Sequence, residues 1–222
     1  MKINCTLLVL FCSLLSWAQK TTDKNEQSVY KVVDSLFRED QFYFSISYNL
    51  VQNRPSGFKQ YSFSSGLTAG FLRDIPLSKD RKWAIAPGLG YSYNNIKQFI
   101  NSADVVENPD VIEDIRTKIS THGIDLPFEI RWRNAIPTNH KFWRIYTGFK
   151  ATYLVDATLK LETTTANETL KVLDNVNRWQ YGVYIAAGFN TWNFYAHYGL
   201  NPIFKEGNKM TNLNFGFMFY IL

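Results

Sequence analysis

Residues 178–204 read RWQYGVYIAAGFNTWNFYAHYGLNPIF, and this stretch decides the fold of the 222-residue chain. Bulky residues alternate with small or polar ones on both sides of Asn190-Thr191. Alternation of period two across a two-residue turn predicts a β-hairpin with two unlike faces. A soluble sheet would bury the bulky face in a core. A transmembrane barrel would leave that face in lipid and enclose the small, polar face in a narrow lumen.

The same alternation recurs along the rest of the chain and predicts six further strands. Their expected ranges are 41–51, 58–72, 83–94, 123–133, 142–156 and 211–222. Between them we expect a long polar excursion over 95–121, helical at 110–118, and a threonine-rich link over 157–177. Because proline lacks a backbone donor, Pro87 predicts a bulge in the third strand. Eight strands predict an all-β, antiparallel, up-and-down transmembrane β-barrel.

The distribution of charge and glycine favours lipid outside this barrel. Charged residues share one face of the strands with most of the glycines, and a soluble barrel would place its apolar face inside instead. Buried charges need partners, so we expect a polar network in the lumen. Its predicted members are Asp125, Glu129, Arg131, Arg133, Arg144, Lys150, Arg178, Tyr184 and His197.

Turn positions predict which residues face one another across the strands. With Asn190-Thr191 as the turn, Phe189 pairs with Trp192, Gly182 with Gly199 and Tyr184 with His197. A turn around Pro137 would place Asp125 opposite Lys150 and Glu129 diagonal to Arg144. Tryptophans near the strand ends would then form girdles at the two membrane interfaces.

The N-terminus has the pattern of a secretory signal peptide over residues 1–18. Cys5 and Cys12 both lie within it, so we expect neither a disulfide nor a thiolate site in the mature chain. Residues 19–40 are predicted to form a periplasmic segment with a short amphipathic helix, and residues 41–222 the barrel. This helix could pack on the mouth of its own barrel or dock a partner. Its apolar residues are Val29, Val32, Val33, Leu36 and Phe37.

The sequence offers little sign of catalysis or of ligand binding. Its three histidines are far apart, which disfavours a metal site, and we expect no cofactor and no small-molecule substrate. The net charge of +5 is spread along the chain, so we expect no nucleic-acid partner. Asp125 and Glu129 fit a structural network better than an acid–base pair. We therefore expect no enzymatic activity.

Loop lengths predict how the barrel lies in the membrane. Links at 52–57, 95–121, 157–177 and 205–209 would face outside. Links at 73–82, 134–141 and 190–191 would face the periplasm, together with both termini. Outer-membrane barrels have longer links on the outer side, which agrees with this assignment.

Four segments resemble the PorT-type outer-membrane β-barrel proteins of the Bacteroidetes. They are REDQFYFSISYNL (38–50), GFLRDIPLSKDRKWAIAPGLGYSYN (70–94), LPFEIRWRN (126–134) and KFWRIYTGFKATY (141–153). That family is associated with the type IX secretion system and, in gliding species, with motility. The resemblance implies a component or assembly factor of that system, whose partners are the lipid bilayer and other secretion subunits.

Under this hypothesis the partner contacts would lie on the periplasmic side. They would comprise residues of segment 28–39 together with Asp74, Lys79 and Arg81. A surface adhesin that uses the two long outer links is the main alternative. A generic structural barrel and a lipid-modifying enzyme are the others.

Overall fold

The computed structural model describes residues 40–54, 60, 63–78, 80–101, 114–134, 142–162, 167–207 and 209–221. The predicted signal peptide and the predicted amphipathic helix lie outside these ranges. So do six of the predicted partner contacts, namely Lys79 and five others. Those five are Val29, Val32, Val33, Leu36 and Phe37. The described residues include no helix that is long and apolar enough to cross a membrane.

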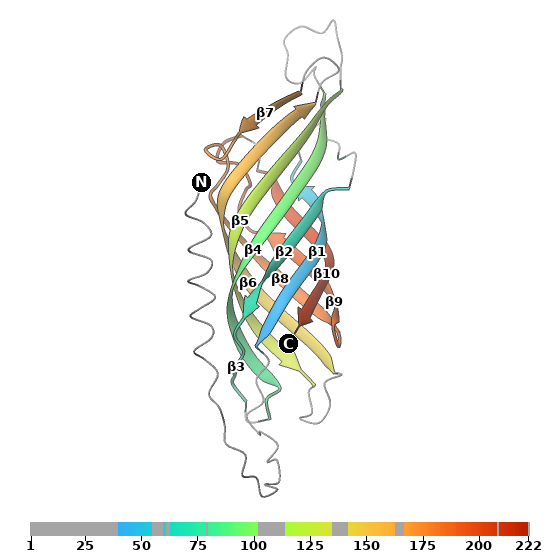
Figure 1. The fold of residues 1–222 in the computed structure, drawn as a ribbon, viewed down its shortest axis with the longest axis vertical. Helices are drawn as coiled ribbons and strands as arrows, with labels where there is room; N and C mark the ends of the chain where they lie inside the picture. The colour runs from blue at the N-terminus through green and yellow to red at the C-terminus, as the bar shows by residue number, and fades with distance from the viewer. Residues whose placement is uncertain are drawn as a thin grey trace, which may run out of the picture. The chain divides into compact units, whose positions relative to one another are not determined.

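The described residues form strands of a single antiparallel sheet that closes on itself (Figure 1). The strands are β1 Gln41–Gln52, β2 Ser65–Leu72, β3 Ile75–Pro76, β4 Trp83–Asn101, β5 Asp114–Arg133, β6 Trp143–Glu162, β7 Asn167–Lys171, β8 Trp179–Phe189, β9 Trp192–Gly199 and β10 Thr211–Ile221. Their order is β2-β1-β10-β9-β8-β6-β5-β4, and pairing of β2 with β4 closes the barrel. The short β3 continues the line of β2 along β4, and β7 adds to β6. The predicted eight-stranded up-and-down barrel is confirmed.

The hairpin of β8 and β9 has the register that its sequence predicts. Phe189 pairs with Trp192, Gly182 with Gly199 and Tyr184 with His197. Asn190 in the turn has a φ of 57°, a left-handed conformation that asparagine tolerates better than most residues. Because register is fixed by the turn, every side chain of this hairpin faces the side that its alternation assigns.

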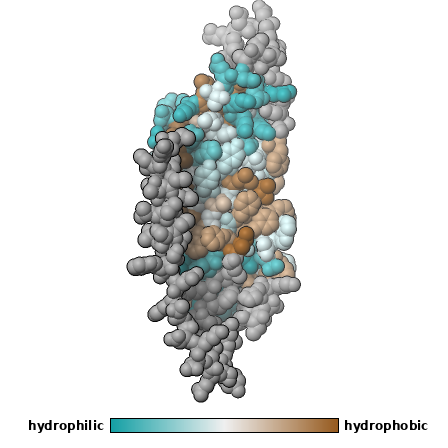
Figure 2. All heavy atoms as spheres, viewed as in Figure 1, coloured by the Kyte–Doolittle hydropathy of each residue, from teal (hydrophilic) through white to brown (hydrophobic). Residues whose placement is uncertain are grey.

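The outward face of the strands is apolar and aromatic. Phe194 is 71% exposed and Ile185 47%, whereas the residues next to each of them in the chain, Tyr184, Ala186, Asn193 and Tyr195, are buried. Figure 2 shows hydrophobic side chains gathered in a band on the visible face, with hydrophilic ones towards the upper end. Aromatic contacts mark one edge of the band, where Trp179 lies beside Tyr153 and Tyr181. Such a band flanked by aromatic residues is the form that a lipid-facing wall takes.

Two strands are longer than the sequence predicts. Residues 95–101 and 114–121, expected in a polar excursion, pair with each other as the ends of β4 and β5. The predicted helix over 110–118 is therefore wrong at 114–118, which is strand, and 110–113 lie outside the described residues. β6 likewise runs on to Glu162 and pairs with β7, where a link was expected. Polarity misled the prediction here, because strands that extend beyond the apolar band carry polar side chains while keeping their backbone ladder.

Two other strands are shorter. β2 begins at Ser65 instead of residue 58; residues 63 and 64 lie outside it, and of residues 58–62 the structure describes only residue 60. β9 ends at Gly199 instead of residue 204. There the Asn201 side chain accepts a hydrogen bond from Tyr181 N–H and donates one to Trp179 O, which turns the chain away from the ladder.

The bulge expected at Pro87 is absent from β4. The register between β4 and β5 is the same on both sides of this residue. Pro87 lies beside the gap between β2 and β3, and Arg73 N–H donates to Pro87 O there. The backbone N–H that proline lacks is therefore missing at a place where the neighbouring ladder is interrupted. The register shift lies instead at His122/Gly123, between β5 and β6.

Candidate functional site

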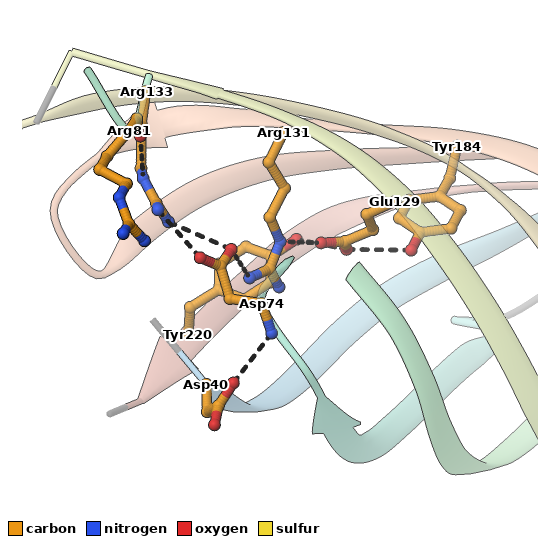
Figure 3. Close-up of polar contacts among 8 residues, drawn as sticks. All are labelled: Asp40, Asp74, Arg81, Glu129, Arg131, Arg133, Tyr184 and Tyr220. Carbon is orange, nitrogen blue, oxygen red and sulfur yellow. Dashed lines mark hydrogen bonds and ion pairs between the residues drawn. The ribbon is translucent and has the colours of Figure 1, made fainter. Parts of the chain in front are cut away.

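The barrel interior near the 73–82 turn holds a network of buried charges (Figure 3). Asp74 accepts hydrogen bonds from Arg131 Nη1 at 3.1 Å and from Arg133 Nη2 at 2.9 Å. Arg131 Nε also donates to Glu129 Oε2 at 2.8 Å. These four side chains are almost completely buried. Two arginines and two carboxylates thus neutralise one another, which is the condition for burying charge.

Tyrosines surround this network from other strands. Tyr184 on β8 and Tyr220 on β10 both donate to Glu129 Oε1, at 2.9 and 3.0 Å. The Arg131 guanidinium lies over the Tyr146 ring, 4.8 Å from its centroid, and Arg144 lies 4.7 Å from the ring centroid of Phe142. The contacts run from β5 to its neighbour β6 and across the lumen to β8 and β10, so those to β10 brace opposite walls of the barrel.

A second polar cluster lies further along the lumen around Asp125. Its carboxylate accepts from Ser92 Oγ at 2.8 Å and from Thr152 Oγ1 at 2.6 Å. Lys150 Nζ lies 3.4 Å from Asp125 Oδ2. Each charged group in this part of the lumen again faces an opposite charge or a hydroxyl donor.

The expected pairing across β5 and β6 is wrong in register. Thr152 lies opposite Asp125, and Lys150 lies opposite Pro127. Lys150 still reaches Asp125, because its side chain is long enough to span a diagonal position. Glu129 lies opposite Gly148 and bonds to Arg131 on its own strand, so its expected diagonal contact with Arg144 is also wrong.

The structure places eight of the nine predicted network residues in the interior. Those eight are Asp125, Glu129, Arg131, Arg133, Arg144, Lys150, Tyr184 and His197. Arg178 is the exception and corrects the prediction. It precedes β8 and is exposed, and its Nη2 pairs with Asp174 Oδ1 at 3.1 Å.

The predicted partner contact at Asp74 is also corrected. Asp74 is buried among the arginines and cannot present its carboxylate to a partner. Its backbone N–H donates to Asp40 Oδ1 at 2.9 Å, and Arg81 O accepts from Arg133 Nε at 2.9 Å. The 73–82 turn is thus tied to the lumen through Asp74 and Arg81.

Glycines on the inner face make room for the large side chains of the network. A Cβ added at Gly148 would lie 2.7 Å from the Tyr184 ring, and one at Gly182 would clash with His197. Beside them is a cavity of about 40 Å³ lined by Lys150, His197, Asn212 and Asn214, among others. Apolar side chains such as Ile119 and Leu154 line it as well, and its volume is room for about three water molecules.

At the end of the interior opposite the 73–82 turn, buried apolar side chains close the barrel. Val176 and Phe204 form a bridge between two connecting segments. The buried cluster beneath it comprises Val51, Ile96, Leu154, Ala157, Val176, Ile203 and Met210. The sequence analysis placed Val176 in the threonine-rich link and Ile203 near the end of the second strand of the 178–204 hairpin. The signal it missed was the presence of large apolar residues in connections that otherwise carry Asn and Asp.

The histidines do not converge on a ligand site. His197 lies in the lumen, His122 contacts Tyr91 at the outer face, and His140 lies outside the described residues. Among the residues that the structure describes, no group of three or more His, Cys, Asp or Glu side chains could hold a metal ion.

A comparison with models of protein families agrees with this architecture. A family model described as "Outer membrane protein beta-barrel domain" matches residues 17–205. Among solved structures, the chain is similar to Ail, the attachment invasion locus protein of Yersinia pestis, with 12% identity and a TM-score of 0.40. That alignment covers 81% of this chain and 97% of Ail. No curated protein sequence matches the chain.

Proposed function

This chain belongs to the outer membrane protein beta-barrel domain family, and from that premise we propose that it is a non-enzymatic component or assembly factor of the type IX secretion system. It acts through protein contacts made at the periplasmic end of the barrel. The resemblance of its strand segments to PorT-type proteins supports this role. The bilayer surrounds the barrel wall, and other secretion subunits bind the turns.

One observation carries the proposal, which is the way the 73–82 turn is held. Asp74 and Arg81 anchor it to buried arginines, while Leu77 beside them is 62% exposed. Ile75 is exposed as well. A turn that is fixed from inside and displays apolar side chains outside is pre-organised for a partner, because little ordering entropy is lost on binding. Asp74 then positions the surface and Leu77 contacts the partner.

The proposal includes an orientation in which both termini and this turn face the periplasm. The strands β4, β5 and β6 extend past the apolar band at the opposite end. Outer-membrane barrels carry short periplasmic turns and longer extracellular parts, which supports the same orientation.

Affinity isolation from outer membranes tests this proposal, with the Leu77→Ser variant as the perturbation. We expect wild type to recover secretion subunits and Leu77→Ser to recover fewer, because an apolar anchor is lost. Leu170→Ser is the matched control, since Leu170 is exposed on β7 at the other end. Equal recovery with wild type and Leu77→Ser would contradict the assigned contact surface.

Deletion of residues 28–39 gives a second prediction. The segment precedes β1, so the barrel should still fold and keep its heat-modifiable migration in gel electrophoresis. We expect secretion of cargo protein to be lost, because the segment contributes the apolar residues Val29, Val32, Val33, Leu36 and Phe37 to the partner contact. Normal secretion by a folded deletion variant would refute that role.

A surface adhesin is the second candidate, favoured by the extension of β4–β7 beyond the barrel. Strands β4 and β7 form the two edges of that extension, and the described residues of β7 are exposed. Exposed edges can pair with a strand of another protein. Replacing residues 98–117 and 159–170 by short turns, which leaves the buried Ile96, Ala157 and Val176 in place, discriminates the two functions. Lost attachment with intact secretion would favour the adhesin.

A further inference from the structure

The outward face of the extended sheet carries a row of lysines that the sequence separates widely. Lys97 on β4 lies opposite Lys118 on β5, and Lys118 lies opposite Lys160 on β6. The register shift at His122/Gly123 brings Lys160 onto this face, because it inserts one residue into β6 and reverses the parity of the later β6 residues. Three lysines therefore occupy neighbouring positions on adjacent strands.

This arrangement is unfavourable for the protein alone. Like charges directly opposite one another destabilise a sheet. Lys160 has a partner in Glu162, with Nζ 2.8 Å from Oε1. In the described part of the chain, no ion pair involves Lys97 or Lys118. Lys118 bonds to the Tyr93 side chain and lies near the Glu162 carboxylate. Arg116 and Lys171 add further positive charge on the neighbouring strand positions, and Glu162 lies opposite Arg116, so that cations still outnumber carboxylates at these positions. An anion bound across the row would relieve the repulsion.

The row has a defined height relative to the membrane. Tyr93 and His122 pair on the same outward face, four residues nearer the apolar band than Lys97 and Lys118. With a rise of about 3.3 Å per residue and a strand tilt of about 40°, four residues correspond to about 10 Å along the barrel axis. Polar headgroups occupy about 5–8 Å beyond each side of the hydrocarbon core, and lysine side chains can bend back towards them. The ammonium groups thus lie at the level of lipid phosphates.

From this geometry we infer that the Lys97–Lys118–Lys160 row binds the phosphate groups of a glycolipid in the outer leaflet. The three strands present the lysines in a line, which fits a headgroup with more than one phosphate better than it fits a single anion. The tyrosines below the row contact the lipid at the boundary between acyl chains and headgroup. The binding rests on the proposed orientation, which places this end of the barrel at the cell surface.

Binding of diphosphorylated lipid A to the folded full-length protein in neutral detergent tests the inference. We expect the variant K97Q/K118Q/K160Q to bind about a hundredfold more weakly at low salt, since each lysine beside an anionic surface contributes about 1 kcal/mol. The control K82Q/K205Q/K209Q changes the net charge equally at exposed positions outside the row and should bind as wild type does. Both variants are checked for heat-modifiable migration, which reports a folded barrel.

Further binding measurements identify which molecule carries the phosphate. Lipid A with both phosphates removed should bind wild type no better than it binds the triple variant, and high salt should weaken wild-type binding. Equal affinity of the row variant and the control variant for diphosphorylated lipid A would overturn the inference. So would complete displacement of the lipid by an equal concentration of inorganic phosphate, which would indicate a soluble anion instead. Secretion is not measured, so a failure here leaves the proposed function standing.

Discussion

Replacement of Asp74 by alanine is expected to lower the free energy of unfolding by about 3–5 kcal/mol, because it leaves buried arginines without their carboxylate. Asp74 accepts from both Arg131 and Arg133, and all three side chains are fully buried. Had Asp74 been the exposed contact that its place in a turn suggests, the change would be within about 0.5 kcal/mol. The measurement therefore separates a residue that positions the turn from one that touches a partner.

Urea unfolding of the barrel in lipid vesicles gives the free energy. The matched control is Glu162→Ala, which breaks the exposed pair with Lys160 and should leave the unfolding midpoint unchanged. Asp74→Asn should fall between wild type and Asp74→Ala, because the amide keeps the shape and one acceptor but loses the charge. A midpoint for Asp74→Ala equal to that of wild type would contradict the buried network.

Replacement of Ile185 by arginine should destabilise the barrel by about 2–4 kcal/mol, because an arginine at the bilayer midplane is costly on a lipid-facing strand. Ile185 lies near the middle of β8 and points outward. Val155 also points outward, but it lies beside Tyr153 at the outer edge of the apolar band. Val155→Arg should therefore cost only about 0–1 kcal/mol.

The comparison is made by unfolding the two variants in the same vesicles. A wall in contact with lipid predicts a cost that depends on depth. Equal and small costs at Ile185 and Val155 would mean that water reaches the middle of the wall, and the membrane assignment would fail.

The sequence predicts the wall of the barrel well because each strand repeats the same alternation of bulky residues with small or polar ones. Alternation in β8 and β9 assigns every side chain to one face, and the two-residue turn leaves no freedom in their register. Charged residues that share a face with glycine must lie inside if the other face is in lipid, and Glu129 and Arg131 do.

The features that the sequence could not predict depend on the lengths of the strands and on side-chain contacts across the lumen. Alternation does not say where a strand ends, so the polar ends of β4 and β5 resemble a loop in sequence. The residues around Pro137 leave the β5–β6 register open, so the predicted register with Asp125 directly opposite Lys150 is wrong, although the two side chains still form an ion pair. Asp74 looks like an ordinary turn residue, because only the closed barrel brings it to Arg131 and Arg133.

The central claim is that the bulky face of the β8–β9 hairpin is in contact with lipid. Photolabelling from a diazirine placed in the acyl chains, read residue by residue by mass spectrometry, tests it without any substitution. A lipid-facing hairpin should be labelled at Val183, Ile185 and Phe194, which point outward, and not at Tyr184 or Ala186, which are buried. Labelling of the inward residues, or no labelling of the outward ones, would contradict it.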